Sequence, residues 1–149
     1  MMKLRDIMTT DFCCASPSDS LSKVGSEMKR HNVGIMPVCQ NGNLVGVITD
    51  RDIVVQCVAA GVDPKDCKVG SFMTKELIQA SPDMDIGDAA RLMGDEQVRR
   101  LPVVEGGRLV GMVSIGDLAV HSQDDKMIAG VLREISMPVR SVKMEAIAA

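Results

Sequence analysis

The sequence feature that most constrains the fold is an internal duplication. A shift of 65 residues, the offset from Pro37 to Pro102, aligns segment 4–55 with segment 69–120 without a gap. About 15 of the roughly 52 aligned positions are identical, where chance would give about three, and such self-similarity marks a repeated structural unit. The chain is therefore expected to fold as two copies of one unit.

The hydrophobic pattern predicts the order β-α-β-β-α in each repeat. A Ser-Pro pair is expected to begin the first helix, with Ser as N-cap, and a tight Asn-Gly or Gly-Gly turn joins the next two strands. In the first repeat we expect a strand at 12–14, a helix from Ser16-Pro17, strands at 33–39 and 44–49 around Asn41-Gly42, and a helix at 52–60. In the second we expect a strand at 77–79, a helix from Ser81-Pro82, strands at 98–104 and 109–114 around Gly106-Gly107, and a helix at 117–122.

The duplication also predicts the domain organisation. A repeat of about 50 residues is marginal alone, so two α/β (α+β) motifs are expected to pack sheet to sheet about a pseudo-twofold axis. We place the motifs at 4–62 and 69–122, with 1–122 forming one pair and a C-terminal helix and tail at 123–149. That helix is predicted from the spacing of Met127, Ile128, Val131, Leu132 and Ile135 before Pro138, and the tail after it is expected to be loosely held.

Composition and charge exclude several classes of protein. The net charge of −3, with no basic run longer than a pair, argues against nucleic acid as a partner. No apolar stretch approaches the roughly 20 residues of a membrane span, and no signal-peptide apolar region is present, so we expect a cytoplasmic protein with no membrane partner. Neither His31 nor His121 lies at a metal-ligand spacing, and no nucleophile–base pair is visible, so neither a metal site nor an enzyme is expected.

Five cysteines without Cys-x-x-Cys spacing argue against a disulfide framework or a zinc ribbon. Buried free thiols are the default expectation. Cys14 and Cys39 would come close if their strands are neighbours in the sheet, so a redox-responsive thiol pair is an alternative.

Each repeat ends its last strand with a hydroxyl residue that an aspartate follows three positions later, namely Thr49 and Asp52 or Ser114 and Asp117. The pattern Ser/Thr-x-x-Asp resembles a helix capping box, which would make these residues structural. The same helix N-terminus also attracts phosphate, and a carboxylate beside it can accept both hydroxyls of a ribose. Both interpretations remain open from the local pattern alone.

The gapless duplication, the β-α-β-β-α order and Gly-h-h-Thr/Ser-x-x-Asp (h, hydrophobic) at the end of each unit resemble a tandem pair of CBS motifs, named for cystathionine β-synthase, over residues 4–122. This resemblance implies a stand-alone, non-enzymatic regulatory module of the bacterial or archaeal type. Such pairs bind adenine nucleotides such as AMP, ADP or ATP, and in some members NAD or S-adenosylmethionine, in clefts between the motifs. They commonly form dimers, so a homodimer and a separate effector protein are the expected partners.

The resemblance also implies roles for particular residues. Asp52 and Asp117 would hold the ribose, and Thr49 and Ser114 would approach phosphate or ribose. The base pocket would be lined by the first strand and by the segment around the strand proline; these residues are Cys13, Cys14, Met36, Pro37, Leu77, Ile78, Arg100, Leu101 and Pro102.

The two hydroxyl–aspartate corners are not equivalent in charge. The first carries Asp50, which would repel phosphate, and Arg51, which would attract it. Arg99 and Arg100 stand where the first repeat has Gly34 and Ile35, and they could reach phosphates or remain solvated. We therefore expect unequal affinities, with the second corner favoured. The rival interpretation is an interaction module whose clefts are empty and whose corners only cap helices.

Overall fold

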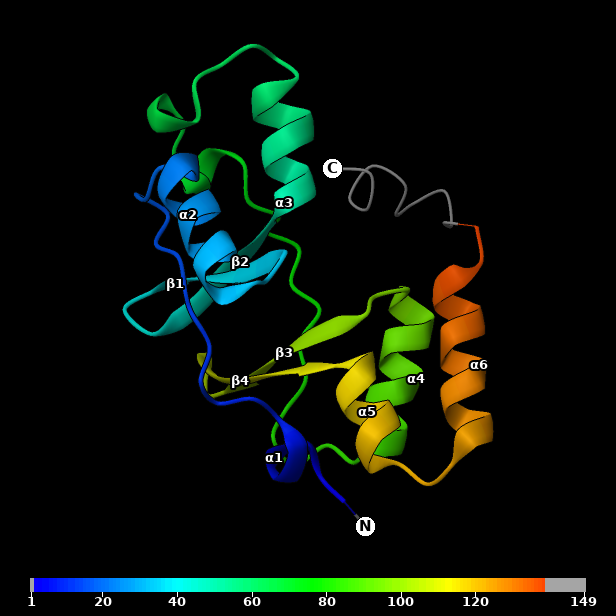
Figure 1. Ribbon diagram of the computed structural model, residues 1–149. Coiled ribbons are helices and arrows are strands. Elements are labelled where there is room, and N and C mark those ends of the chain that lie inside the picture. The colour runs from blue at the N-terminus through cyan, green and yellow to red at the C-terminus, as the bar shows by residue number, and fades with distance from the viewer. Residues whose placement is uncertain (1, 139–149) are drawn as a thin grey trace. The chain divides into compact units, whose positions relative to one another are not determined.

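The computed structural model describes residues 2–138 of the 149-residue chain (Figure 1). The expected loose tail, residues 139–149, lies outside the described residues. The elements before residue 78 are α1 (Leu4–Ile7), α2 (Leu21–His31), β1 (Ile35–Gln40), β2 (Asn43–Thr49), α3 (Asp50–Asp52), η1 (Ile53–Val58), η2 (Pro64–Asp66) and η3 (Val69–Ser71). Those after it are α4 (Ile86–Glu96), β3 (Arg100–Glu105), β4 (Arg108–Ser114), α5 (Ile115–His121) and α6 (Asp125–Ser136).

The chain forms two compact units, each built on one antiparallel hairpin and its helices. The hairpin-1 unit comprises residues 13–77 and contains β1 and β2. The hairpin-2 unit comprises the described residues 2–12 and 78–138 and contains β3 and β4 (Figure 1). The predicted mixed α and β class is therefore confirmed.

Both hairpins use the turn that the sequence predicts. The turn residues all have positive φ, at 55° for Asn41 and 82° for Gly42, and at 60° and 82° for Gly106 and Gly107. Asn and Gly tolerate this left-handed conformation, which matches the twist of a two-residue hairpin. Each hairpin then shifts register at one equivalent point, after Val38 and after Val103.

Each repeat begins with a polar segment before its first strand, residues 4–11 and 69–76, which we call the lead-ins. These lead-ins are exchanged between the two units, which the sequence does not predict. α1 begins the first repeat in sequence but lies in the hairpin-2 unit, where Leu4 is fully buried. The equivalent Val69 of the second repeat is fully buried in the hairpin-1 unit. Paired backbone hydrogen bonds of 2.8–3.0 Å join Thr9 to Met112 and Thr74 to Val47. Each repeat thus lends its lead-in to the unit that holds the other repeat's hairpin.

A glycine in the last strand of each hairpin receives the exchanged lead-in. A Cβ at Gly46 would lie 2.7 Å from Met73 Sδ and 2.9 Å from the Thr74 carbonyl oxygen. A Cβ at Gly111 would lie 2.5 Å from Met8 Sδ. Both positions favour glycine, because a methionine side chain occupies the space that a Cβ would fill.

The predicted starts of the first helices and the predicted extents of the first strands are wrong. The helices expected at Ser16-Pro17 and Ser81-Pro82 begin one turn later, after the N-caps Ser20 and Asp85. The first strands expected at 12–14 and 77–79 are single bridges, Ala15 with Val38 and Ala80 with Val103. Pro17 and Pro82 lack the N–H that continued pairing needs, so the chain leaves each hairpin at once.

The closing helices start two residues earlier than predicted, directly after Thr49 and Ser114. The first of them continues from α3 into a π-helical segment, in which the Ala59 N–H donates to the Val54 carbonyl at 2.9 Å. The second, α5, is α-helical throughout.

The predicted C-terminal helix is confirmed as α6, which buries Val131 against the hairpin-2 core. The C-terminal end of α6 is bound by Gln97, which lies at the left-handed C-terminal end of α4. Its Nε2 donates to the carbonyls of Glu134 at 3.1 Å and Met137 at 3.2 Å. These bonds satisfy carbonyls that a helix end leaves unpaired.

Each unit has its own hydrophobic core. The most deeply buried residues of the hairpin-1 core are Leu21, Val24, Met36, Val38, Ile48, Cys57 and Val69. Those of the hairpin-2 core are Leu4, Ala89, Ala90, Met93, Leu101, Val103, Val113 and Leu118.

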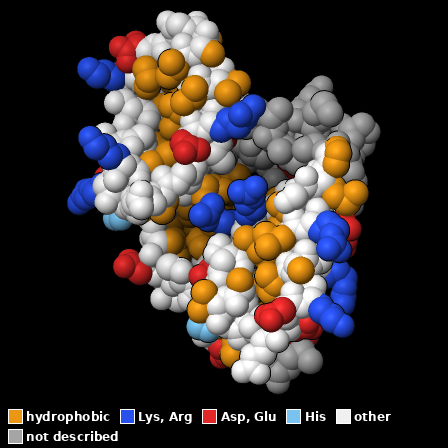
Figure 2. All heavy atoms as spheres, turned by 45° about the vertical axis from the view of Figure 1, so that its right-hand side comes forward, with side chains coloured by type: hydrophobic (Ala, Val, Ile, Leu, Met, Phe, Trp, Pro, Cys, Tyr) orange, Lys and Arg blue, Asp and Glu red, His pale blue; other side chains and the backbone are white. Residues whose placement is uncertain are grey.

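Hydrophobic side chains also reach the surface (orange in Figure 2). The exposed ones on the closing helices are Val54, Val55 and Val58 in η1 and Val120 in α5. Within residues 2–138, none of the helices has the length and hydrophobicity needed to cross a bilayer.

Candidate functional site

The hydroxyl and aspartate of each corner form a reciprocal capping box. The Asp52 N–H donates to Thr49 Oγ1 at 3.1 Å, and the Thr49 N–H donates to Asp52 Oδ2 at 2.9 Å. In the second corner the Asp117 N–H donates to Ser114 Oγ at 3.1 Å, and the Ser114 N–H donates to Asp117 Oδ2 at 2.8 Å. The predicted capping role of these residues is therefore confirmed. It leaves the Oδ1 atom of each carboxylate outside the cap.

The two corners differ in how much of the aspartate side chain is exposed to solvent. Asp52 is only 1% exposed, and its Oδ1 accepts a long hydrogen bond of 3.5 Å from Gln56 Nε2. Asp117 is half-buried, and its N–H and Oδ2 make the same cap. The second carboxylate is thus the more accessible one.

The strand register gives the two corners different charged neighbours. Thr49 lies across the hairpin from Ile35, whereas Ser114 lies across from Arg100. Directly opposite residues have Cβ atoms about 4.5–5.5 Å apart, which puts the Arg100 side chain within reach of the second corner. Arg99 is adjacent, because its carbonyl accepts from the Ile115 N–H at 2.8 Å.

At the first corner an acidic side chain occupies the corresponding position. The Asp50 N–H donates to the Gly34 carbonyl at 2.9 Å, and a Cβ on Gly34 would lie 2.9 Å from Asp50 Oδ2. Arg51 is exposed in the same turn. The first corner is therefore mixed in charge, and the second has two arginines.

The residues expected to line a base pocket fall into two groups. Met36, Pro37, Leu101 and Pro102 are buried, and Met36 and Leu101 belong to the two cores. The carbonyls of Pro37 and Pro102 accept from the bridging alanines at 2.9 Å. The others, Cys13, Leu77 and Ile78, are half-buried, and Cys14 and Arg100 are exposed. The first group serves the core, so a ligand would have to contact the second.

The cysteines form two close pairs in the hairpin-1 unit. Cys39 Sγ donates to Cys14 Sγ at 3.4 Å, as the alternative of a thiol pair requires, and Cys57 Sγ lies 3.4 Å from Cys67 Sγ. Although the residue as a whole is exposed, partial burial of the Cys14 sulfur, together with the hydrogen bond from Cys39, raises the pKa of this thiol to about 12. Burial also raises the pKa of the Cys39 thiol.

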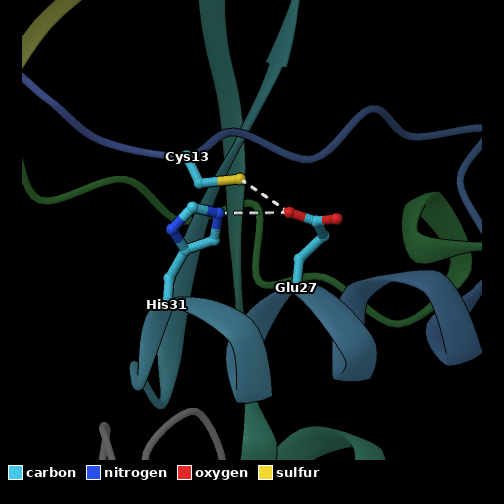
Figure 3. Close-up of side chains that lie close together, drawn as sticks. All are labelled: Cys13, Glu27 and His31. Atoms are coloured by element: carbon cyan, nitrogen blue, oxygen red, sulfur yellow. Dashed lines mark hydrogen bonds and ion pairs between the residues drawn. The ribbon is translucent and has the colours of Figure 1, made fainter.

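Sequence reasoning missed one cluster, made by Cys13, Glu27 and His31 (Figure 3). Glu27 Oε2 accepts from Cys13 Sγ at 3.7 Å and lies 3.2 Å from His31 Nε2. Burial and the negative charge of Glu27 raise the pKa of the Cys13 thiol. Glu27 and His31 are four residues apart on α2, a spacing that places them on one helix face. That spacing is visible in the sequence, but the Cys–His and His–His spacings typical of zinc sites do not include it.

Comparison with known proteins gives the chain its relatives. The family model described as "CBS domain" matches residues 4–58 and 69–124. CBS domain-containing protein YhcV of Bacillus subtilis is 40% identical over 136 residues, which cover 91% of this chain and 96% of that protein. Hypoxic response protein 1 of Mycobacterium tuberculosis is 33% identical over 129 residues, covering 86% and 90%.

Two solved structures share the fold. The structure of Hypoxic Response Protein I with two coordinated zinc ions aligns with a TM-score of 0.75 at 34% identity, over 81% of this chain and 99% of that one. The structure of CBSX2 in complex with AMP aligns with a TM-score of 0.70 at 28% identity, over 80% and 95%. The duplication, the two capped corners and these matches agree: the chain belongs to the CBS-domain family and carries two copies of the motif in tandem.

Proposed function

We propose that this CBS pair is a non-enzymatic regulatory module that binds an adenine nucleotide, with AMP as the first candidate. Asp52 or Asp117 would accept the ribose hydroxyls, and Thr49 or Ser114 would face a phosphate. The AMP complex of CBSX2 supports the choice of ligand class, because that protein is similar to this chain over most of both lengths.

The observation that carries the proposal is the second corner. It combines a helix N-terminus, a hydroxyl, a half-buried carboxylate and a cross-strand arginine. A helix N-terminus favours negative charge, and guanidinium groups bind phosphate in a bidentate manner. The carboxylate Oδ1 left outside the cap is the acceptor that a ribose diol needs.

The two corners should bind with unequal affinity. At the first, the buried Asp52 and the exposed carboxylate of Asp50 oppose a phosphate. At the second, Arg99 and Arg100 favour one. The second corner is therefore the tighter site, and a nucleotide at low concentration would occupy it first.

Calorimetry with AMP and ATP on the wild type, Asp52→Ala and Asp117→Ala tests this. We expect Asp117→Ala to weaken binding by roughly tenfold or more, because a hydrogen bond to a charged group contributes about 1.5–3 kcal/mol. Asp52→Ala should change the first binding event less. Asp85→Ala, which removes the N-cap of α4 away from the corner, is the matched control and should leave affinity unchanged.

Equal losses in the two corner variants would contradict unequal sites. An absence of binding by AMP, ADP, ATP, NAD and S-adenosylmethionine would favour the rival interaction module.

Light scattering on the same samples tests the proposed homodimer, for which the exposed Val55 and Val120 occupy equivalent positions on the two closing helices. A monomer with and without nucleotide would reject it. The signal would pass to a separate effector protein by a shift between two states, to which the nucleotide binds with different affinity.

A redox response at Cys14 and Cys39 is a weaker candidate. Their sulfur atoms are close, but a pKa of about 12 leaves Cys14 almost entirely as the unreactive thiol at neutral pH. Intact mass before and after reduction, with peptide mapping, distinguishes two free thiols from a disulfide. A Cys14–Cys39 disulfide in protein purified without reductant would support the redox response.

A further inference from the structure

We propose that Cys13, Glu27 and His31 form a binding site for a single zinc ion in the hairpin-1 unit. The three side chains converge from two segments: Cys13 from the extended chain before α2, and the other two from one face of α2 (Figure 3). One ligand atom from each residue lies within 4.8 Å of the other two.

The separations fit a tetrahedral zinc ion. Zn–S, Zn–N and Zn–O bonds of about 2.3, 2.0 and 2.1 Å imply edges of about 3.4–3.6 Å between ligand atoms. The Sγ–Oε2 edge is 3.7 Å and the Nε2–Oε2 edge is 3.2 Å. Two edges of the tetrahedron are therefore already formed, and the third, between the thiol and the imidazole, lies within 4.8 Å.

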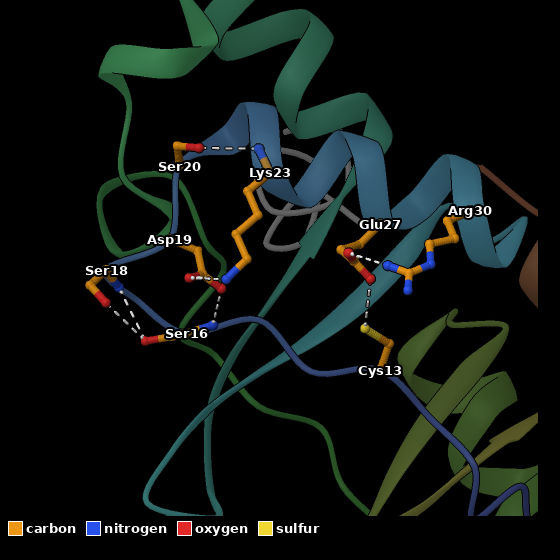
Figure 4. Close-up of polar contacts among 8 residues, drawn as sticks. All are labelled: Cys13, Ser16, Ser18, Asp19, Ser20, Lys23, Glu27 and Arg30. Carbon is orange, nitrogen blue, oxygen red and sulfur yellow. Dashed lines mark hydrogen bonds and ion pairs between the residues drawn. The ribbon is translucent and has the colours of Figure 1, made fainter.

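The charge and the outer contacts also suit a divalent cation. A cysteine thiolate and a glutamate carboxylate neutralise Zn²⁺, and a neutral imidazole completes three protein ligands, which leaves one position for water or a further ligand. Arg30 Nη1 donates to Glu27 Oε1 at 3.3 Å, so that Oε2 is the atom turned toward Cys13 (Figure 4). Such an outer partner fixes the orientation of a ligating carboxylate.

The duplication argues that this cluster is more than a surface ion pair. At the equivalent positions the second repeat has Ile78, Leu92 and Glu96. Ile78 and Leu92 pack against the hairpin-2 core, so apolar contact is what the fold itself places there. The first repeat replaces this contact with a thiol and a carboxylate beside a histidine. A Glu27–His31 ion pair would need no thiol, whereas zinc makes use of all three groups.

The test is a titration of the full-length chain, kept reduced, with Co²⁺ as a spectroscopic substitute for zinc. We expect one ion per chain, with thiolate-to-cobalt charge-transfer absorption and the intense visible bands of a tetrahedral site, and displacement of Co²⁺ by Zn²⁺. Cys13→Ser should abolish the charge-transfer band. Glu27→Gln and His31→Gln should each weaken binding by at least about tenfold, since even outer-shell changes cost 10–100-fold.

Cys14→Ser is the matched control, because it removes the adjacent thiol and should leave both the band and the affinity unchanged. The double variant Cys13→Ile with Glu27→Leu introduces the residues of the second repeat and should stay folded without binding the ion. A charge-transfer band that persists in Cys13→Ser, or that disappears in Cys14→Ser or Cys57→Ser, would overturn the proposal. So would the absence of saturable binding to the folded wild type.

Discussion

The two repeats share their local backbone features and differ in the side chains around them. Both have a left-handed helix end at Asn32 or Gln97, a strand glycine at Gly46 or Gly111, and a capping box at each corner. The differences lie in what faces these devices, such as arginines beside the second corner and a thiol–carboxylate–imidazole cluster beside α2 of the first. The comparison teaches that features present in both copies serve the fold, whereas features in one copy are the candidates for what distinguishes the two repeats in function.

The largest effect that would sharpen this comparison is at the strand glycines. We expect Gly46→Ala to cost about 3 kcal/mol and Gly111→Ala about 1 kcal/mol, within the range for overpacking a tight site. The added Cβ at residue 46 would meet a backbone carbonyl, Thr74 O, which accepts from the Val47 N–H in a residue that two backbone hydrogen bonds join to Val47. At residue 111 it would meet only the flexible side chain of Met8. Urea unfolding measures both values.

Double variants provide the control for the glycine prediction. Met8→Ala should be favourably coupled to Gly111→Ala and recover most of its cost, while Met73→Ala should recover only part of the cost of Gly46→Ala. Equal recovery at the two sites would show that the carbonyl contact is not the decisive one.

A smaller effect is expected at the two left-handed helix ends. Gln97→Asn keeps a residue that tolerates positive φ but shortens the side chain that reaches α6. We expect a loss of about 1 kcal/mol, the usual net contribution of a hydrogen bond, and faster hydrogen exchange at the end of α6. The reverse exchange, Asn32→Gln, serves as control and should cost less, because the structure gives Asn32 a capping role only through its backbone N–H. Equal costs would mean that the conformation of the residue, rather than its reach, matters.

The sequence predicts what depends on local chemistry. The hairpin turns, the repeat and α6 follow from positive-φ residues, from identity at a fixed offset and from helical spacing. The start of α2 does not follow, because Ser16 and Ser20 are both able to cap. Asp19 resolves the choice in the structure: its carboxylate accepts from the Ser16 N–H at 2.8 Å and forms a turn before the helix (Figure 4). The exchange of the lead-ins is a matter of long-range packing, and no local signal encodes it.

Some features of the candidate site could likewise be predicted from local sequence, and others depend on long-range contacts. The capping role of the corners could be predicted from four consecutive residues, and the structure contains it in both repeats. The proximity of Arg100 to Ser114 depends on strand register, which the matching turn and strand lengths only imply. The Cys13 cluster needed the extended chain to pass over α2, a tertiary contact that spacing along the sequence does not specify.

The smallest expected effect concerns the Cys14 thiol, which has no counterpart in the second repeat because Gln79 stands there. Its native pKa of about 12 exceeds the ordinary value of 9.0, mainly because the sulfur atom is partly removed from solvent. Above pH 9 the unfolded chain releases this proton while the native protein keeps it, so stability is full below pH 9 and falls as pH rises toward 12. Cys14→Ser should make the fall shallower in urea unfolding at pH 8 and pH 10, and Gln79→Ser should leave it unchanged. A slope that is the same in Cys14→Ser as in the wild type would show that this thiol is as well solvated in the native protein as in the unfolded chain.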